Sequence, residues 1–225
     1  MAQRAIMDQI GRLMGLRYKS HPWHGVDIGD NAPLEVNCYI EMVPSDTVKY
    51  EADKKTGYLK LDRPQKYANF APALYGFVPQ TYCGDLVGEF CNEKTGQKGI
   101  KGDGDPLDIC VLTESEISHG DILCEAIPIG GFRMIDGHKA DDKIVAVLKD
   151  DVIYGKYKDI SEVPDKAIAR IKHYFLTYKD MPDQKVGTVE IPHMYNREEA
   201  HEVIKYSMKD YIKRYEELGE ALSSY

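Results

Sequence analysis

Seven short segments rich in β-branched and aromatic residues follow one another through the middle of the chain, and no helical pattern separates them. They are residues 34–43, 47–53, 58–62, 75–82, 107–112, 121–129 and 143–148. Turn-forming sequences such as KKTG at 54–57 lie between them. Because an alternating α/β sheet needs a helix between successive strands, the pattern predicts a β-barrel or a β-sandwich.

Helical periodicity appears only outside this strand region. Within residues 164–179, one apolar stripe consists of Ile168, Ile171, Phe175 and Tyr178. Asn196 followed by Glu199 resembles a capping box, so a second amphipathic helix is expected over 196–222. Apolar spacing also suggests a short helix within residues 6–14. The predicted fold class is therefore mainly β with flanking helices, and the two C-terminal helices cover the barrel from outside.

The chain is expected to form one domain over residues 1–225, because it contains no internal repeat, disordered linker or shift in composition. A chain of this length buries roughly 70–75% of its unfolded surface. Within that domain, residues 1–33 are predicted to be an N-terminal extension. The glycine-rich stretch 83–102 is predicted to be a long loop or hairpin excursion.

Charge and cysteine content exclude several classes of protein. The formal net charge of −8 disfavours a nucleic-acid partner, and the chain has no long uncharged run that would span a membrane. Five cysteines without CxxC spacing predict mostly buried thiols in a reducing compartment. Cys83 and Cys91 are interpreted as ordinary thiols, with a redox or metal pair as the alternative. Residues 1–25 lack a signal-peptide core, so the cytoplasm is the expected location.

Three carboxylates, Asp103, Asp105 and Asp108, fall within six residues. Leu107, Ile109 and Val111 alternate directly behind them, which ties the cluster to a buried strand. Carboxylates held this close raise each other's pKa unless a cation lies between them. Oxygen-only ligands select magnesium, calcium or manganese over zinc, so the cluster predicts a hard divalent metal site.

A second acidic cluster consists of Asp136, Asp141 and Asp142, and Lys143 closes it. Taken alone it is typical of a polar hairpin. Beside the first cluster, it suggests two acidic loops at the same end of adjacent strands, where two or more metals could assist phosphate hydrolysis. The cationic and phenolic side chains suited to such a phosphate site are Lys49, Arg63, Tyr178 and Lys179.

Three other functions are compatible with parts of this pattern. Asp103, Asp105 and Glu114 occupy the first, third and twelfth places of an EF-hand-like calcium loop, although its flanks are predicted strands. An OB-type barrel that binds single-stranded nucleic acid shares the predicted architecture, but the net charge opposes it. A metal-dependent phosphohydrolase acting on nucleotides is the third alternative.

Five motifs occur in a fixed order: VKYEADKKTG, LDRP, GDGDPLD, MIDGHKADDK and HYFLTYKD. Together they resemble the soluble family I inorganic pyrophosphatases over roughly residues 34–180. HPWHG at 21–25 and the long C-terminal helix resemble the plant-type branch. The resemblance implies a five-stranded OB-like barrel and the hydrolysis of pyrophosphate to two phosphates. It also implies several Mg²⁺ ions per site, with Mn²⁺ as a possible substitute, and a homo-oligomer, for which a hexamer is favoured over a dimer.

The resemblance also implies roles for individual residues. Asp103, Asp108 and Asp141 match ligands of the tightly bound metals, with Asp108 bridging two of them. Asp136 matches a ligand of substrate-delivered magnesium, and Glu41 matches a ligand that acts through water. Asp105 matches the general base. The phosphate-binding set corresponds to Lys49, Arg63, Tyr75, Lys143, Tyr178 and Lys179, with Glu51 as a supporting carboxylate. One departure is Ala71, which stands where the family often has a tyrosine.

Overall fold

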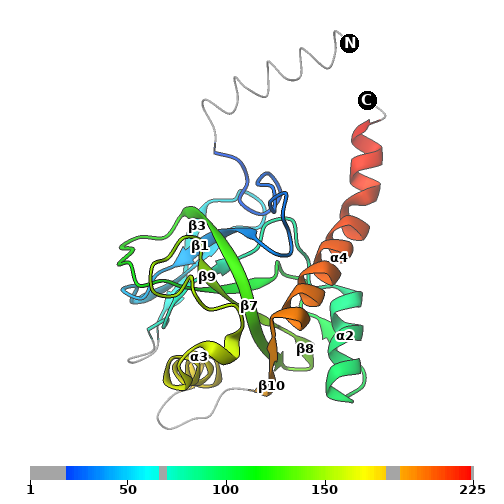
Figure 1. Ribbon diagram of the computed structural model, residues 1–225. Coiled ribbons are helices and arrows are strands. Elements are labelled where there is room, and N and C mark those ends of the chain that lie inside the picture. The colour runs from blue at the N-terminus through cyan, green and yellow to red at the C-terminus, as the bar shows by residue number, and fades with distance from the viewer. Residues whose placement is uncertain (1–18, 66–69, 181–187, 224–225) are drawn as a thin grey trace.

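The computed structural model describes residues 19–65, 70–180 and 188–223 (Figure 1). The helix expected within residues 6–14 lies outside the described residues. The strands are β1 Val36–Met42, β2 Val48–Ala52, β3 Leu59–Pro64, β4 Leu74–Phe77, β5 Lys101–Gly102, β6 Asp108–Leu112, β7 Ile122–Asp136, β8 Lys139–Ala140, β9 Lys143–Leu148 and β10 Val189–Asn196. The helices are α2 Asp85–Thr95, α3 Asp165–Thr177 and α4 Arg197–Ser223, with a 3₁₀ turn η1 at Ile160–Glu162.

A closed ring of five strands forms the centre of the described fold. Strand β1 pairs with β4, β4 with β6, β6 with β9 and β9 with β7, and β7 pairs back onto β1. Only the β6–β9 pairing in this ring is parallel. Gly76 lets β4 approach β1, since a Cβ there would lie 1.9 Å from the carbonyl oxygen of Tyr39. The predicted five-stranded barrel is confirmed as this ring.

Strands β6 and β9 are buried on both faces. Ile109 and Ile144 belong to a hydrophobic cluster that includes side chains of α2 and α4. Their neighbours Cys110 and Val145 belong to a second cluster, which includes side chains of α3. Because successive strand residues point to opposite faces, covering both faces requires continuous apolar runs such as ICVL and IVAV. The helices therefore stabilise the ring from its outside, as predicted (Figure 1).

Both predicted C-terminal helices are present. In α3, the predicted stripe residues Ile168, Ile171 and Phe175 are buried. At the start of α4, the side-chain oxygen of Asn196 accepts a hydrogen bond of 3.0 Å from the backbone N–H of Glu199, which confirms the predicted cap. None of the helices within the described residues is both long enough and apolar enough to cross a membrane.

The prediction of a loop excursion over residues 83–102 is wrong, because this stretch contains helix α2. Val87, Phe90 and Cys91 have helical spacing and are buried. The glycine content concealed this pattern in the sequence, but the glycines have local roles. Gly96 ends the helix in a left-handed conformation. Gly88 lies against the following chain, where a Cβ would approach the backbone nitrogen of Gly102 to 2.9 Å.

Helix α2 is capped from α4 rather than by its own residues. The carboxylate of Asp210 accepts hydrogen bonds from the backbone N–H groups of Gly84, Leu86 and Val87 at 3.0, 3.1 and 3.1 Å. Asp210 is 3% exposed. We expect Asp210→Ala to lower the free energy of unfolding by about 2–3 kcal/mol, because it leaves buried N–H groups without an acceptor. Urea unfolding measures this loss.

Asp85→Ala is the matched control for this prediction. Asp85 is in the first turn of the same helix, but its side chain is exposed and its nearest cation, Lys213, lies 3.5 Å away in solvent. An exposed pair of this kind contributes little, so we expect a loss below about 1 kcal/mol. Equal losses in the two variants would contradict the capping role of Asp210.

Candidate active site

The two acidic loops meet at one edge of the ring. Strands β6 and β9 run parallel, and their register places Asp108 beside Lys143 at the start of each strand. Strand β7 runs antiparallel to β9 and ends at Asp136, so its end reaches the same edge. Asp103 and Asp141 lie in the loops that lead into β6 and β9. Segments distant in sequence therefore present their carboxylates to a common volume.

A pocket of about 300 Å³ opens at this edge. Every side chain to which the family resemblance gave a role lines it: Glu41, Lys49, Glu51, Arg63, Tyr75, Asp103, Asp105, Asp108, Asp136, Asp141, Lys143, Tyr178 and Lys179. They come from strands of the ring, from the loops that lead into β6 and β9, from the β2–β3 hairpin and from the end of α3. The pocket therefore combines carboxylates with cationic and phenolic side chains. We call its carboxylates other than Glu51 the acidic wall, namely Glu41, Asp103, Asp105, Asp108, Asp136 and Asp141.

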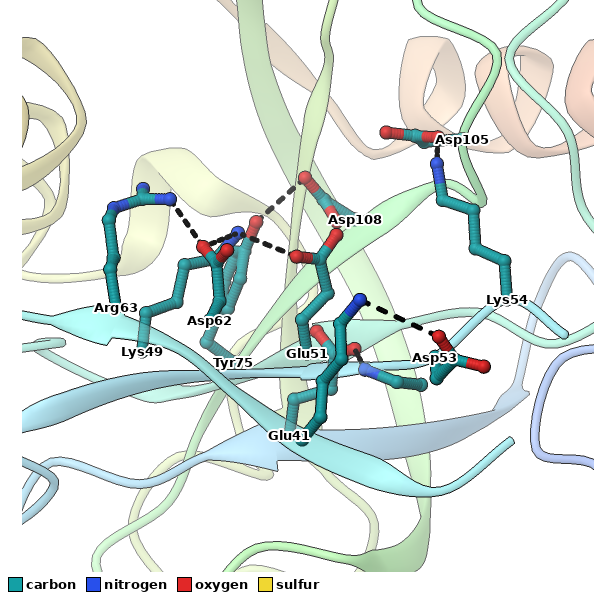
Figure 2. A network of polar contacts seen from close by, with 12 residues as sticks. Glu41, Lys49, Glu51, Asp53, Lys54, Asp62, Arg63, Tyr75, Asp105 and Asp108 are labelled. Carbon is teal, nitrogen blue, oxygen red and sulfur yellow. Dashed lines mark hydrogen bonds and ion pairs between the residues drawn. The ribbon is translucent and has the colours of Figure 1, made fainter. Parts of the chain in front are cut away.

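Lys143 lies between two of the pocket carboxylates. Its ammonium group donates to Asp108 and to Asp141, and its side chain is 3% exposed. Burial alone would lower the pKa of Lys143, but the two carboxylates raise it well above its usual value. The hydroxyl of Tyr75 donates to the same Asp108 at 2.7 Å (Figure 2). Asp108 thus contacts a cation and a phenol at the base of the pocket.

Three other carboxylates that line the pocket, Asp103, Asp141 and Glu41, have raised pKa values. Burial, with the charge of Asp141, raises the pKa of Asp103 to about 8. Burial also raises the pKa of Asp141 and brings that of Glu41 to about 8. In the described part of the chain, no three His, Cys, Asp or Glu side chains are already arranged as a metal site. The donor set nevertheless fits hard divalent ions, because its carboxylates share one pocket and repel one another when ionised.

The cationic side of the pocket is built largely by the β2–β3 hairpin. Lys49 and Arg63 are partners in its register. The ammonium nitrogen of Lys49 lies 3.8 Å from Glu51 and 3.7 Å from Asp62, and Arg63 also contacts Asp62. Figure 2 shows these side chains on the same side of the hairpin as Tyr75 and Asp108. The hairpin therefore contributes two cationic side chains to the lining of the pocket.

The end of α3 supplies one phenolic and one cationic side chain, those of Tyr178 and Lys179. Tyr178 follows the last residue of the helix and packs on Phe175 and Tyr174 of the same helix. The ammonium group of Lys179 contacts Asp136, which also lines the pocket. Burial would raise the pKa of Asp136, but Lys179 holds it below its usual value. Asp136 is therefore ionised under conditions in which Asp103 and Glu41 retain their protons.

Among the other residues that line the pocket, sequence reasoning gave no role in the site to the side chains of His21, Trp23, Lys54 and Lys139. The ammonium group of Lys54 contacts Asp105 (Figure 2). Trp23 is held by a hydrogen bond of 2.7 Å from its ring nitrogen to the carbonyl oxygen of Thr81. His21 and Trp23 belong to HPWHG, which was interpreted as part of an extension, and Lys54 belongs to KKTG, which was interpreted as a turn. Lys139 belongs to MIDGHKADDK, where only the aspartates and Lys143 were given roles. Only the packing of residues 19–33 against the ring brings the extension to the site.

The structure also places four other features that the sequence analysis singled out. Asp142 does not line the pocket, since its carboxylate contacts Arg133 instead. Ala71 is buried in the cluster beside α3. The EF-hand-like alternative is wrong, because Asp108–Leu112 is a strand and separates Asp105 from Glu114. All five cysteines are free, and only Cys124 is partly exposed, which confirms the predicted buried thiols.

The raised pKa of Glu41 predicts how stability depends on pH in the metal-free protein. The backbone N–H of Ala52 donates to Glu41 at 2.7 Å, yet burial raises the pKa of Glu41 to about 8. The folded protein therefore retains a proton that the unfolded chain releases near its ordinary pKa. Stability falls as pH rises from about 4.5 to 8. In Glu41→Gln, we expect this fall to be smaller by about 2–4 kcal/mol, measured by urea unfolding in EDTA.

Glu35→Gln is a suitable control for this pH series. Glu35 lies outside the pocket, and its carboxylate pairs with Lys149 at 2.5 Å near the surface. Its replacement should leave the slope between pH 5 and 8 almost unchanged. The same slope in Glu41→Gln as in the parent protein would show that Glu41 is ionised throughout this range.

Comparisons with known proteins agree with this geometry. A family model described as inorganic pyrophosphatase matches residues 38–212. An inorganic pyrophosphatase of Chlamydia trachomatis is 52% identical over 196 residues, covering 85% of this chain and 94% of that protein. A soluble inorganic pyrophosphatase of Oryza sativa is 37% identical over 193 residues, covering 85% and 79%. The crystal structure of an inorganic pyrophosphatase from Thermus thermophilus superposes with a TM-score of 0.71 at 30% identity, covering 86% and 99%.

Proposed function

Because the chain belongs to the inorganic pyrophosphatase family and hydrolyses pyrophosphate to two phosphates, we propose that it does so with Mg²⁺ held by Asp103, Asp108 and Asp141. The observation that carries this proposal is the convergence of buried carboxylates and phosphate-binding cations in one pocket of about 300 Å³. Proteins of this family use divalent metals, and the oxygen-only ligand set favours Mg²⁺, with Mn²⁺ as a substitute.

The carboxylates and the cationic side chains of the pocket are proposed to have different roles. Pyrophosphate oxygens repel an incoming nucleophile, so the site must neutralise charge before attack. Bound divalent ions would supply that neutralisation and lower the pKa of a water molecule toward neutrality. In our proposal Asp103, Asp108 and Asp141 hold the tight ions, Asp136 adds a ligand for an ion that arrives with substrate, and Glu41 acts through water.

Asp105 is proposed to be the general base. It lies at the pocket wall with its side chain 41% exposed, and its ion partner Lys54 approaches from the β2–β3 turn. A carboxylate in this position can accept or steer the proton of an attacking water. The backbone N–H of Asp105 donates to Asp103 at 2.9 Å. The base is therefore tied directly to a proposed metal ligand.

Cationic and phenolic groups are proposed to hold the two phosphates. Lys143, Tyr178 and Lys179 face the phosphoryl group under attack, whereas Lys49 and Arg63 stabilise the departing phosphate. Tyr75 binds through its hydroxyl, which already donates to Asp108. Glu51 supports this set by its position 3.8 Å from the ammonium nitrogen of Lys49. Arginine offers paired donors to phosphate oxygens, while lysine supplies a compact charge.

Phosphate release from pyrophosphate with Mg²⁺ tests this proposal. ATP and a nucleotide monoester serve as competing substrates, and EDTA as the metal-free control. We expect rapid release from pyrophosphate, little from the nucleotides and none in EDTA. Equal rates on ATP would favour a nucleotide phosphohydrolase. Full activity in EDTA would contradict the metal requirement.

Assembly and location are also proposed. We propose a cytoplasmic homo-oligomer, with a hexamer favoured over a dimer, on the basis of the family resemblance and the five free cysteines. No nucleic-acid or membrane partner is proposed. Sedimentation velocity measures the assembly, and a monomer at micromolar concentration would contradict it.

A further inference from the structure

A second cluster of buried charges lies outside the set of side chains that line the pocket. At its centre is Arg133 of β7, whose side chain is 0% exposed. Its Nη1 donates to Oδ2 of Asp142 at 2.6 Å, and its Nη2 donates to Oε1 of Glu199 at 2.8 Å. We call Asp142, Arg133 and Glu199 the buried charge triad.

The triad connects the ring to its covering helices. The guanidinium carbon of Arg133 lies 5.0 Å from the ring centroid of Phe90 in α2 and 4.9 Å from that of Tyr195 in β10. Glu199 belongs to the first turn of α4 and also lies 3.6 Å from Lys94 of α2. A planar guanidinium can stack on rings and form directed hydrogen bonds together. Arg133 therefore links β7, β10, α2 and α4 to Asp142.

Asp142 stands in the chain between Asp141 and Lys143, which both line the pocket. Successive side chains of an extended segment point to opposite sides, so the contact of Asp142 with Arg133 fixes its two neighbours toward the pocket. The backbone supports the same arrangement. The N–H of Asp141 donates to the carbonyl oxygen of Met134, next to Arg133, at 3.0 Å. A displacement of Asp142 would therefore displace Asp141 and Lys143 together.

Stability alone does not account for this arrangement. Apolar side chains of similar size often replace a buried ion pair without loss, because burying charges is costly. Arg133 Nε also has no hydrogen-bond partner among the described residues. What the triad supplies is a fixed direction for the Asp142 side chain, since its partner Arg133 is itself held by Glu199 and by the rings of Phe90 and Tyr195.

We propose that Arg133 is a positioning residue that acts through Asp142 to orient Asp141 and Lys143 for metal and phosphate binding. Through Glu199, the same residue makes that orientation depend on the packing of α2 and α4 against the ring. This inference rests on the proposed roles of Asp141 and Lys143. Partners behind a metal ligand typically change metal affinity 10–100-fold when they are removed.

The double variant Arg133→Met/Asp142→Leu tests the inference, because it removes both charges and retains side-chain volume. Binding of Mn²⁺ alone is measured by electron paramagnetic resonance, and amide hydrogen exchange of residues 140–143 is measured in EDTA. We expect Mn²⁺ affinity to fall at least about 10-fold. We also expect the amides of residues 140–143 to exchange faster in the metal-free variant than in the metal-free parent protein, at a temperature below the melting temperature of the variant.

Single variants keep the test decisive if the double variant does not fold. Asp142→Asn retains an acceptor for Arg133 but loses the charge, and Arg133→Lys retains the charge but loses the fork. Both should give intermediate affinities. Lys94→Met is the matched control, because within the triad Lys94 contacts Glu199 alone, it otherwise lies over the Phe90 ring, and its side chain is 37% exposed. It should leave Mn²⁺ affinity unchanged.

Parent-like Mn²⁺ affinity and exchange in the folded variants overturn the inference, even where the melting temperature falls. Failure of the proposed function would be recognised from the unmodified protein and not from the variants. In that case the unmodified protein itself neither binds Mn²⁺ nor releases phosphate from pyrophosphate.

Discussion

Asp105→Asn lowers the turnover number for pyrophosphate hydrolysis by about 10²–10⁴ and leaves the fold intact. The amide keeps the shape of the side chain but has no basicity, and general-base catalysis accounts for losses of this size. The fold should persist, because Asp105 is partly exposed and its structural bonds are made by its backbone to Asp103 and Cys83. Steady-state kinetics at saturating Mg²⁺, with circular dichroism, measure both properties.

Asp85→Asn is the control for this prediction. It makes the same chemical change at an exposed carboxylate on α2 that does not line the pocket. Its turnover number should match that of the parent protein. Near-normal turnover in Asp105→Asn would remove Asp105 from the base role and direct attention to another carboxylate of the acidic wall.

Asp108→Ala should weaken Mg²⁺ binding as well as the rate. Asp108 is the proposed bridging ligand, and its carboxylate also accepts hydrogen bonds from Lys143 and Tyr75. Its removal takes one negative charge from the acidic wall and leaves the Lys143 ammonium inside the site. We expect the Mg²⁺ midpoint for activity to rise at least about 10²-fold. A magnesium titration of activity and direct Mn²⁺ binding measure it.

Tyr75→Phe distinguishes the contribution of the Asp108 charge to Mg²⁺ binding from that of its hydrogen bond with Tyr75. This variant removes the hydroxyl that donates to Asp108 at 2.7 Å and leaves the carboxylate in place. Its Mg²⁺ midpoint should rise far less than that of Asp108→Ala. An unchanged magnesium titration in Asp108→Ala would show that the bridging assignment is wrong.

Local patterns predicted the elements that depend on near neighbours. The alternation behind Asp108 identified β6, and the stripe through Ile168 and Phe175 identified α3. Helix α2 was missed for a different reason. Its sequence has buried residues at helical spacing, but Gly88 interrupts it, Gly84 and Gly96 flank it, and its cap is supplied by Asp210, more than a hundred residues away. A cap from another helix leaves no local signal.

The acidic motif GDGDPLD determined by itself that this chain concentrates carboxylates at the start of a buried strand, because alternation and turn chemistry act over a few residues. Only the tertiary structure decided which distant groups join them. The parallel register of β6 and β9 brings Asp141 and Lys143 to Asp108. Adjacent residues Asp141 and Asp142 then separate, one toward the pocket and one toward Arg133, because long-range pairing selects which side of a strand faces which partner.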